Sequence, residues 1–484
     1  MKYNSIWSDF KIKDLPQLEK DLEVDVLVIG GGITGVSTAY HLKNKNLKVC
    51  LVERNKIGSG VTARTTGKLT FLQENIYSKL KKYHNLKTAK LYLKSQIDAI
   101  KLVKTIIEKE NINCDFHQVK SYVFENKNIK KLNKELQLLK KLNVNLKETN
   151  ILPNKKKVSK AIYHNETYVF HPLKYLQALI DICLNNEIDI FENTKIEKID
   201  KKNNLFICQA NNCIIKAKYV VLAMHYPYFL FPFLMPFKTH LEKSYIAAFP
   251  VNKNYQFSAI NISKPTISLR YQTEDNQNWE IFLTNSHNMA IKDNYQKNFQ
   301  QLLQKNKKYP EYLWSNKDII TNDYLPFIGA LKEKNLFIAT GYNTWGMTNG
   351  SLAGKIIADL IFKKENIYAN LFNPLRDLNL GKILNFPLII GSNTYSFTKS
   401  HLVKQKKWYS NNVRFEKRNG KNIAIYIDET KKEHIVYNLC PHLKCGLLFN
   451  EIEKTWDCPC HGSRFDIDGH CIEGPSNYDI TYKE

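Results

Sequence analysis

The N-terminal part of the chain begins with a pattern of apolar runs that predicts a strand, a helix and a second strand. Residues 24–29 (VDVLVI) form the first run, a helical pattern continues to about residue 44, and residues 47–52 (LKVCLV) form a second run that ends at Glu53. This order and spacing predict a β-α-β unit with two parallel strands.

Further apolar patterns predict that helices and strands alternate along much of the chain. Residues 76–110 repeat apolar side chains at helical spacing and predict one or two long helices, and residues 173–184 predict another. Short apolar runs predict strands at 188–191, 219–223 and 336–340, the last followed by a helix from Met347. The α/β pattern therefore returns late in the chain.

The remaining segments predict two different kinds of β structure. Residues 241–250, 255–270 and 279–284 alternate apolar and polar positions, as strands of an antiparallel sheet do. Residues 376–410 show no periodicity and are expected to be a connector. The short strands and turn residues of 411–484 predict a small β domain.

The predicted fold is an α/β, Rossmann-like domain interleaved with an α+β antiparallel-sheet domain and followed by a small all-β domain. The Rossmann-like domain is expected at about residues 20–75, 150–225 and 316–375 of a unit spanning 1–375, the antiparallel domain at about 76–149 and 226–315, the linker at 376–410, and the all-β domain at 411–484.

Composition is that of an ordinary soluble protein except for its charge. The 484 residues are 43% hydrophobic and 24% charged, but 71 basic and 46 acidic residues give a net charge of +25. Such an excess suits a nucleic-acid partner, yet only seven of the basic residues are arginine, the side chain best shaped to bind phosphate. We therefore interpret the charge as lysine-rich compositional drift and expect no nucleic-acid partner.

The N-terminal residues contain no apolar signal-peptide core, so a cytoplasmic protein is expected. The longest apolar run, residues 226–237, contains three prolines and is shorter than the about 20 residues that a membrane-spanning helix needs. We interpret it as a loop packed on the protein and expect no transmembrane segment.

Gly30, Gly32 and Gly35 form a G-x-G-x-x-G pattern between the first predicted strand and its helix. The first glycine allows a tight turn, the second lets a pyrophosphate approach the backbone, and the third lets the helix pack on the strand. Glu53 follows Gly35 by 18 residues, where a carboxylate can accept hydrogen bonds from ribose hydroxyls. The unit predicts a dinucleotide site for either NAD or FAD.

Four further motifs make the chain similar to FAD-dependent oxidoreductases of the glycine oxidase and D-amino-acid dehydrogenase superfamily. They are residues 60–69 (GVTARTTGKL), 171–175 (HPLKY), 193–196 (NTKI) and 340–350 (TGYNTWGMTNG). The resemblance implies FAD as cofactor and a small amine or amino-acid-like substrate. It also implies cofactor contacts at Thr62, Thr65, Thr66, Ile196, Gly341, Gly346, Met347 and Thr348.

Gly346, Met347 and Thr348 stand at the start of the helix predicted after residues 336–340. The resemblance implies that the backbone amides of this helix start point at the isoalloxazine ring. This placement also has a direct physical reason. Reduction puts negative charge on the flavin, and a helix N-terminus presents free N–H groups and the positive end of its dipole.

A substrate site is harder to predict. Arg270 lies on a predicted strand of the antiparallel domain, where this superfamily builds its substrate wall. Because a guanidinium can bind a carboxylate through two hydrogen bonds, Arg270 is a candidate substrate clamp, and an ion-paired or surface arginine is the alternative. Tyr245, His287 and Asp323 are weaker candidates, and no general base is assigned.

Five of the ten cysteines lie between Cys440 and Cys471 and include two boxes shared with histidines, at 440–445 (CPHLKC) and 458–463 (CPCHGS). Each box offers a thiolate and an imidazole, so two loops could hold two irons. Zinc is the alternative, although the C-x-H and C-x-x-H boxes do not match the usual ligand spacing of structural zinc sites.

The boxes resemble those of the Rieske [2Fe–2S] domain over about residues 411–480. The resemblance implies that the cluster ligands are Cys440, His442, Cys458 and His461, and that Cys445 and Cys460 form a disulfide. Phe465 stands where high-potential Rieske proteins have a tyrosine. Loss of that hydroxyl removes a hydrogen bond to a ligand sulfur and predicts a lower reduction potential.

Together the two resemblances predict an FAD-dependent dehydrogenase. It would oxidise a small amine or amino-acid-like substrate and relay the electrons singly through the Rieske cluster to an external one-electron acceptor. The alternatives are a non-catalytic redox sensor and a Rieske-type oxygenase, which would need a further mononuclear iron site.

The charge is unevenly distributed. Residues 411–484 hold 10 basic and 12 acidic residues, whereas residues 77–160 hold 21 lysines and 7 acidic residues. These opposite signs predict that the cluster domain docks against the lysine-rich helical surface of the flavin part.

Overall fold

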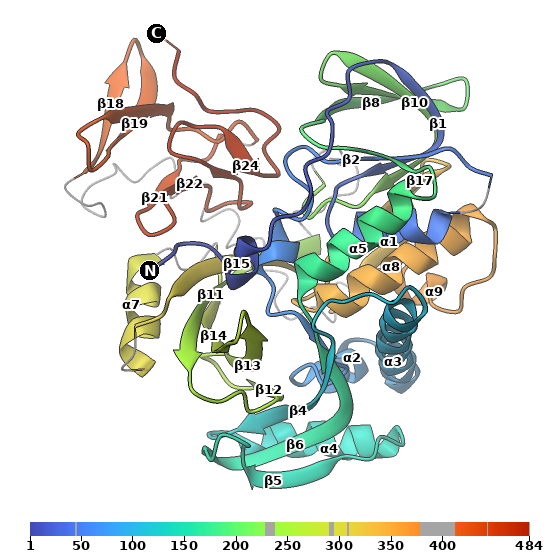
Figure 1. The fold of residues 1–484 in the computed structure, drawn as a ribbon, viewed down its shortest axis with the longest axis vertical. Coiled ribbons are helices and arrows are strands. Elements are labelled where there is room, and N and C mark those ends of the chain that lie inside the picture. Colours follow the sequence, from blue (N-terminus) through green and yellow to red (C-terminus); the bar gives the residue numbers. More distant parts are fainter. Residues whose placement is uncertain are drawn as a thin grey trace.

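The computed structural model contains two large β-sheets with helices packed on them and a small C-terminal β domain (Figure 1). It describes residues 1–43, 46–227, 238–289, 295–306, 309–377, 412–442 and 444–483. The apolar run at 226–237, except its first two residues, and the connector at 376–410, except its first two residues, lie outside this part of the chain.

The first sheet has eight strands: β1 (Leu22–Ile29), β2 (Val49–Val52), β7 (Asp189–Phe191), β8 (Ile196–Lys202), β9 (Leu205–Ala210), β10 (Cys213–Leu222), β16 (Phe327–Ala330) and β17 (Leu336–Thr340). Its main order is β16-β17-β10-β1-β2-β7, and the five strands from β17 to β7 are parallel. Every residue of β2 and β17 is buried, because a parallel sheet is covered on both faces.

Helices α1 (Ile33–Leu42), α5 (Pro172–Leu184) and α8 (Gly346–Ile361) lie side by side against this sheet (Figure 1). Glycine makes the closest approaches possible. A Cβ on Gly35 would lie 1.9 Å from the carbonyl oxygen of Gly30, and a Cβ on Gly354 would lie 2.6 Å from the backbone of Ser37. Helix α1 therefore packs directly on the end of β1, and α8 packs directly on α1.

The second sheet has nine strands: β3 (Lys68–Leu69), β4 (His117–Glu125), β5 (Lys147–Ile151), β6 (Lys157–Val169), β11 (Thr239–Val251), β12 (Phe257–Asn261), β13 (Ile267–Glu274), β14 (Gln277–Asn288) and β15 (Tyr312–Thr321). Its order is β15-β11-β14-β13-β12-β4-β6-β3, with β5 on β6, and only the pair of β12 with β4 is parallel. The remaining helices are α2 (Ile76–Tyr83), α3 (Leu86–Lys109), α4 (Ile129–Lys141), α7 (Tyr295–Asn306), α9 (Ala369–Phe372) and the short 3-10 turns at Ile6–Asp9 and Val61–Arg64.

The regular elements in the described residues of the C-terminal domain are all β-strands: β18 (Val413–Arg418), β19 (Lys421–Ile427), β20 (Glu433–Tyr437), β21 (Leu448–Asn450), β22 (Thr455–Asp457), β23 (Arg464–Phe465) and β24 (Cys471–Glu473). They form a three-stranded and a four-stranded antiparallel sheet around the buried side chains of Trp456 and Phe465. The domain lies beside both large sheets, above β15 in the view of Figure 1.

The predicted fold class is confirmed, and the pattern at 76–110 forms two helices, α2 and α3. The pattern did not predict β4, α4, β5 and β6, which occupy residues 117–169. Strand β6 pairs in the antiparallel sheet, whereas the expected division placed residues after 150 in the nucleotide-binding domain. Residues 160–169 of β6 pair with β4 and residues 157–163 pair with β5, so the middle of β6 has a strand on each side, and its burial alternates only partly.

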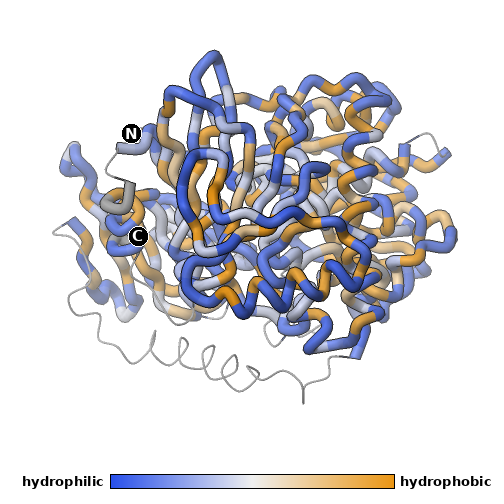
Figure 2. Tube along the Cα trace, turned by 90° about the horizontal axis from the view of Figure 1, so that it is seen from below, coloured by the Kyte–Doolittle hydropathy of each residue, from blue (hydrophilic) through white to orange (hydrophobic). Residues whose placement is uncertain are grey.

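Hydrophobic residues lie mainly inside the molecule and polar residues on its outer turns (Figure 2). None of the helices in the described part of the chain is both long enough and apolar enough to cross a membrane.

Candidate active site and cluster site

A cavity opens at the carboxyl ends of the parallel strands, between the glycine turn after β1 and the start of α8. All but three of the predicted cofactor contacts line it: Gly30, Gly32, Glu53, Thr62, Thr65, Ile196, Gly341, Gly346 and Met347. Ligands of doubly wound sheets bind at this edge, where helix N-termini converge. The residues therefore fit an extended dinucleotide.

Glu53 is oriented for its predicted role. Its two carboxylate oxygens accept backbone hydrogen bonds from Gly31 at 2.7 Å and from Asn55 at 2.9 Å. These bonds fix the carboxylate at the cavity wall, and the remaining lone pairs can accept hydrogen bonds from ribose hydroxyls.

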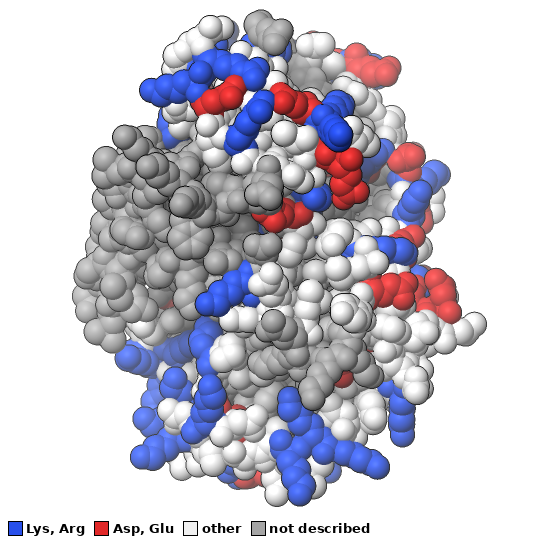
Figure 3. Space-filling view, turned by 90° about the vertical axis from the view of Figure 1, so that its left-hand side faces the viewer, with Lys and Arg blue, Asp and Glu red and all other residues white. Residues whose placement is uncertain are grey.

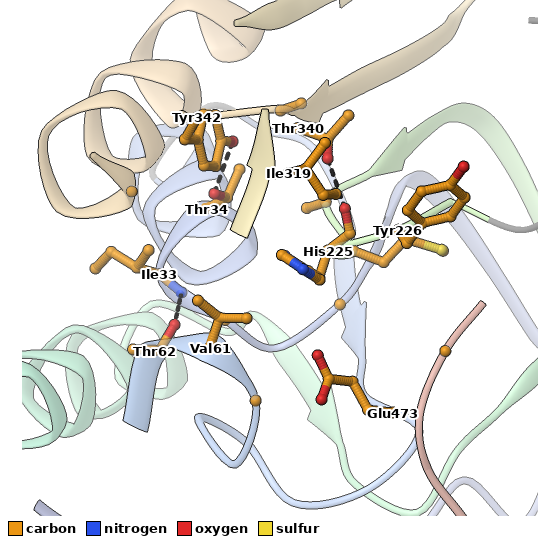
Figure 4. A pocket seen from close by; sticks show the side chains of 18 of the residues that line it. Ile33, Thr34, Val61, Thr62, His225, Tyr226, Ile319, Thr340, Tyr342 and Glu473 are labelled. Carbon is orange, nitrogen blue, oxygen red and sulfur yellow. Dashed lines mark hydrogen bonds between the residues drawn. The ribbon is translucent and has the colours of Figure 1, made fainter. Parts of the chain in front are cut away.

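Side-chain hydrogen bonds hold the cavity walls together (Figure 4). Thr62 Oγ1 accepts a hydrogen bond from the amide of Ile33 at 3.1 Å, and the hydroxyls of Thr34 and Tyr342 lie 2.8 Å apart. The first contact joins the 60–69 loop to the start of α1. The second joins α1 to the loop that precedes α8.

The three predicted contacts that do not line the cavity stand next to residues that do. Gly35 packs α1 on β1, as its predicted role requires. Thr66 presents its carbonyl oxygen to Arg270 at 2.5 Å. Thr348 Oγ1 donates to Gln96 at 2.8 Å, so its side chain holds α8 against α3, while the first amides of α8 have no partners within the helix.

Arg270 does not form the predicted substrate clamp in this structure. Its guanidinium is fully buried and donates to the carbonyl oxygens of Thr66, Gly67 and Phe170 at 2.5, 2.8 and 3.0 Å. It also lies over the ring of Trp7. The guanidinium N–H groups are thus bonded to backbone carbonyl oxygens, and Arg270 does not line the cavity. We therefore assign Arg270 the role of holding the 60–69 loop in place.

The weaker candidates also lie away from the cavity lining. Tyr245 and His287 form a hydrogen bond of 3.0 Å within the antiparallel sheet. Asp323 accepts two hydrogen bonds from Arg376, at 2.7 and 2.9 Å. These groups stabilise the sheet and the segment after α9.

The cavity contains polar residues that the sequence motifs did not indicate: His225 after β10, Asn316 and Asp318 on β15, and Glu473 on β24. His225 is held by its carbonyl oxygen, which accepts a hydrogen bond from Thr340 at 2.6 Å. Burial lowers the pKa of its imidazole to about 4, so the ring is neutral. The only sequence signal for Asn316 and Asp318 was their spacing of two within a largely apolar strand.

The two cysteine-histidine boxes form adjacent loops in the C-terminal domain. The rings of His442 and His461 lie 5.1 Å apart, and the thiols of Cys440 and Cys458 contact each other. Burial lowers the pKa of His461 to about 3, which leaves its imidazole neutral and able to bind a metal. Two thiols and two neutral imidazoles are the donor set that a [2Fe–2S] cluster of the Rieske type needs.

Cys445 and Cys460 form a disulfide that joins the two loops, as the resemblance implies. Cys458 Sγ lies within 4.8 Å of both disulfide sulfurs, but those sulfurs are bonded to each other and have no thiolate to offer a metal. Phe465 is completely buried in the core beneath the loops, and its effect on the reduction potential stays a prediction.

Buried charges join the C-terminal domain to the rest of the protein. We name as the interface charge cluster the residues Arg64, Lys243 and Lys317 of the N-terminal part and Glu453, Asp457, Arg464 and Glu473 of the C-terminal domain. Lys243 Nζ lies 2.8 Å from Asp457, and Lys317 Nζ lies 3.0 Å from Glu473. Although burial opposes ionisation, Arg464 and Lys243 lower the pKa of Glu453 to about 2.

The docking therefore uses opposite charges, but not those that the sequence predicted. The acidic partners do come from the C-terminal domain, whereas the lysines come from β11 and β15. Figure 3 shows lysine and arginine side chains gathered at the end of the molecule opposite the C-terminal domain. The expected role of residues 77–160 as the docking surface is wrong, because no described contact joins them to that domain.

Lys243→Met is expected to destabilise the docked C-terminal domain strongly. The change leaves Asp457 buried with one cation fewer, and breaking a buried ion pair in this way costs about 3–5 kcal/mol. The thermal midpoint for loss of visible absorbance from the cluster should fall. The matched control is Lys264→Met, whose pair with Glu242 is 3.5 Å long and exposed, so an equal fall in both variants would contradict the prediction.

The cavity and the cluster loops are adjacent. Ile472, Glu473 and Gly474 of the C-terminal domain form part of the cavity wall, and Glu473 points into it (Figure 4). Tyr226 lines the same cavity and also lines a small neighbouring pocket with Cys460 and His461. Its ring centroid lies 6.4 Å from that of His461, so this tyrosine stands between the two sites.

Family models match both parts of the chain. Residues 25–360 match the model described as FAD dependent oxidoreductase, and residues 399–482 match the Rieske [2Fe-2S] domain. The chain is 31% identical over 490 residues to YhfW of Bacillus subtilis (strain 168), a protein named as a putative Rieske 2Fe-2S iron-sulfur protein. That match covers 96% of this chain and 94% of YhfW.

Other relatives match the N-terminal part. Gamma-glutamylputrescine oxidoreductase of Escherichia coli (strain K12) is 24% identical over 389 residues, which is 73% of this chain and 88% of the relative. The crystal structure of glycine oxidase from Geobacillus kaustophilus superposes with a TM-score of 0.61 at 15% identity, covering 74% of this chain and 100% of that structure. At this identity the superposition shows a shared fold alone.

Proposed function

Because the chain belongs to the family of FAD-dependent oxidoreductases and carries a C-terminal Rieske [2Fe–2S] domain, we propose that it couples the two cofactors in one reaction. It oxidises a small amine or amino-acid-like substrate at the flavin. It then passes the electrons one at a time through the cluster to an external one-electron acceptor. FAD supplies the two-electron step, and a [2Fe–2S] cluster carries single electrons.

The observation that carries this proposal is the shared wall of the two sites. Ile472, Glu473 and Gly474 close the cavity from the cluster domain, and Tyr226 lies between that cavity and His461. A domain that served only as a separate sensor would not need to contribute to the wall of the oxidation site.

Different residues around the cavity would bind different parts of FAD. Glu53 would accept hydrogen bonds from the ribose, and the glycine turn with the start of α1 would receive the pyrophosphate. The first amides of α8 would donate to the flavin edge that becomes negative on reduction. Asn343 Nδ2 is buried near the start of α8, has no acceptor among the described residues, and can donate in the same region.

An oxygenase reaction is less well supported. It would need a mononuclear iron held by two histidines and a carboxylate. Among the described residues that line the cavity, His225 is the only histidine, so the cavity does not offer the two histidines of such an iron site.

The test is an anaerobic titration of the holoprotein with amines, D-amino acids, imino acids and 2-hydroxy acids. At least one amine or amino acid is expected to bleach the flavin absorbance, after which the reduced cluster should appear in the electron paramagnetic resonance spectrum. Bleaching without cluster reduction would contradict the relay, and no bleaching by any compound would favour a redox sensor. Iron analysis should give two irons per chain, whereas an oxygenase would hold three.

A further inference from the structure

Two hydrogen-bonding side chains on β15 line the cavity near the start of α8, where the isoalloxazine is expected. Asn316 and Asp318 lie on β15 and both line the cavity. Asn316 Nδ2 donates to Asp318 Oδ2 at 3.1 Å, which leaves the other amide atom, Oδ1, without a donor among the described residues. Asn316 is only 6% exposed. An unpaired buried acceptor beside a carboxylate indicates a ligand that donates hydrogen bonds.

This pair lies next to the loop that begins α8. The carbonyl oxygen of Ile319 accepts a hydrogen bond from the amide of Asn343 at 3.1 Å, and Asn343 Oδ1 accepts one from the amide of Thr321 at 2.8 Å. Asp318 therefore stands one residue from the point where β15 is joined to this loop. A group bound to Asp318 would lie close to the start of α8, where the isoalloxazine is expected.

No described lysine or arginine lines the cavity beside Asp318 to receive a substrate carboxylate. Among the described lining residues the only lysine or arginine is Arg54, which donates to the carbonyl oxygen of Ser476 at 3.1 Å beside the ribose site. Arg270 is bound to backbone carbonyls, and Lys317 is paired with Glu473. An α-carboxylate placed here would face Asp318 without a counter-charge.

We propose that Asp318, supported by Asn316, binds the ammonium group of a cationic amine substrate that has no carboxylate on the carbon next to its nitrogen. This inference rests on the proposed function and narrows its substrate class. The ammonium pairs with the Asp318 carboxylate and donates a second hydrogen bond to Asn316 Oδ1. Amines are thereby selected over the corresponding amino acids by the sign of the charge.

The electrostatics of the subsite agree with this assignment. Burial, and then the negative charge of Glu242, raise the pKa of Asp318 to about 7. A carboxylate held in such surroundings is stabilised by a bound cation and destabilised by a bound anion.

The experiment compares matched compounds that differ by one carboxylate: propylamine with 2-aminobutyrate, pyrrolidine with proline, and 1,4-diaminobutane with ornithine. Each is titrated into the full-length holoprotein without oxygen, and the perturbation of the flavin spectrum gives its apparent Kd. At least one amine is expected to bind about 10-fold or more tightly than either enantiomer of its partner. In Asp318→Asn that ratio should fall to about 1, at unchanged flavin content.

The matched control is Asp200→Asn, which changes an exposed aspartate of β8 that pairs with Lys198 and should leave every Kd unchanged. Equal or tighter binding of the amino acids, no binding of any amine, or an unchanged ratio in Asp318→Asn would each overturn the subsite. Failure here is separable from failure of the proposed function. Amino acids that bleach the flavin would overturn only the subsite, whereas amines that bind without bleaching would support the subsite and contradict the proposed oxidation.

Discussion

A Cys458→Ser variant is expected to lose the iron–sulfur cluster while its flavin can still be reduced by substrate. Serine replaces a thiolate ligand with a hydroxyl, which is a poor ligand for this cluster. The two cluster loops should stay joined in the variant, because the disulfide between Cys445 and Cys460 also connects them. Flavin reduction should proceed, because the cavity walls at Glu53, Thr62 and α8 are unchanged.

Loss of the cluster should slow the reoxidation of the reduced flavin. With a one-electron acceptor, the rate is expected to fall about 10-fold or more, which corresponds to at least about 1.4 kcal/mol in the barrier. Stopped-flow absorbance measures both half-reactions, and iron analysis reports the cluster. Cys471→Ser, in the same domain but outside the two boxes, should keep its iron and its rate. An unchanged steady-state rate in Cys458→Ser would show that electrons do not pass through the cluster.

A Gly35→Ala variant is expected to lose most of its FAD. Its new methyl group would lie 1.9 Å from the carbonyl oxygen of Gly30 and 3.4 Å from the side chain of Val28. The first contact is with backbone, which cannot turn aside as a side chain can, so α1 must move away from β1. The glycine turn and the first amides of α1 then lose the position in which they would receive the pyrophosphate.

The measurement for Gly35→Ala is flavin content per chain, with the cluster absorbance as a check that the C-terminal domain has folded. Flavin content is expected to fall to about a tenth or less, since each tenfold loss of affinity needs only about 1.4 kcal/mol. Gly420→Ala is the control, because Gly420 lies between β18 and β19, does not line the cavity, and has no atom within 4 Å of the position of a Cβ. Full flavin content in Gly35→Ala would contradict this account of the cradle.

Local patterns were sufficient where the physics is local. The strand, glycine turn and helix at residues 24–42 are neighbours in the chain, and the carboxylate of Glu53 lies one strand further on. The cysteine-histidine boxes are likewise short loops whose donors are set by spacing. In both cases the chemistry depends on residues that a few backbone turns bring together.

Local patterns failed where a residue's surroundings come from distant segments. The prediction that Arg270 binds a substrate carboxylate rests on its guanidinium and on its strand in the antiparallel domain. Its partners, the carbonyls of Thr66, Gly67 and Phe170, are 100 or more residues away. The prediction of the docking surface was wrong for the same reason. The net charge of residues 77–160 does not indicate which lysines become buried opposite Asp457 and Glu473.

Short-range order along the chain was enough to predict the fold class, a dinucleotide site and two cysteine-histidine boxes, whereas FAD and the [2Fe–2S] cluster followed from the resemblance of these and further motifs to known families. How the two sites meet depends on tertiary packing. Tyr226 and Glu473 are far apart in sequence, yet both line the flavin cavity beside the cluster domain. Asp318 became a candidate for substrate recognition only when β15 was placed against the start of α8. Contacts of this kind arise from the packing of whole sheets and domains, and no local pattern encodes them.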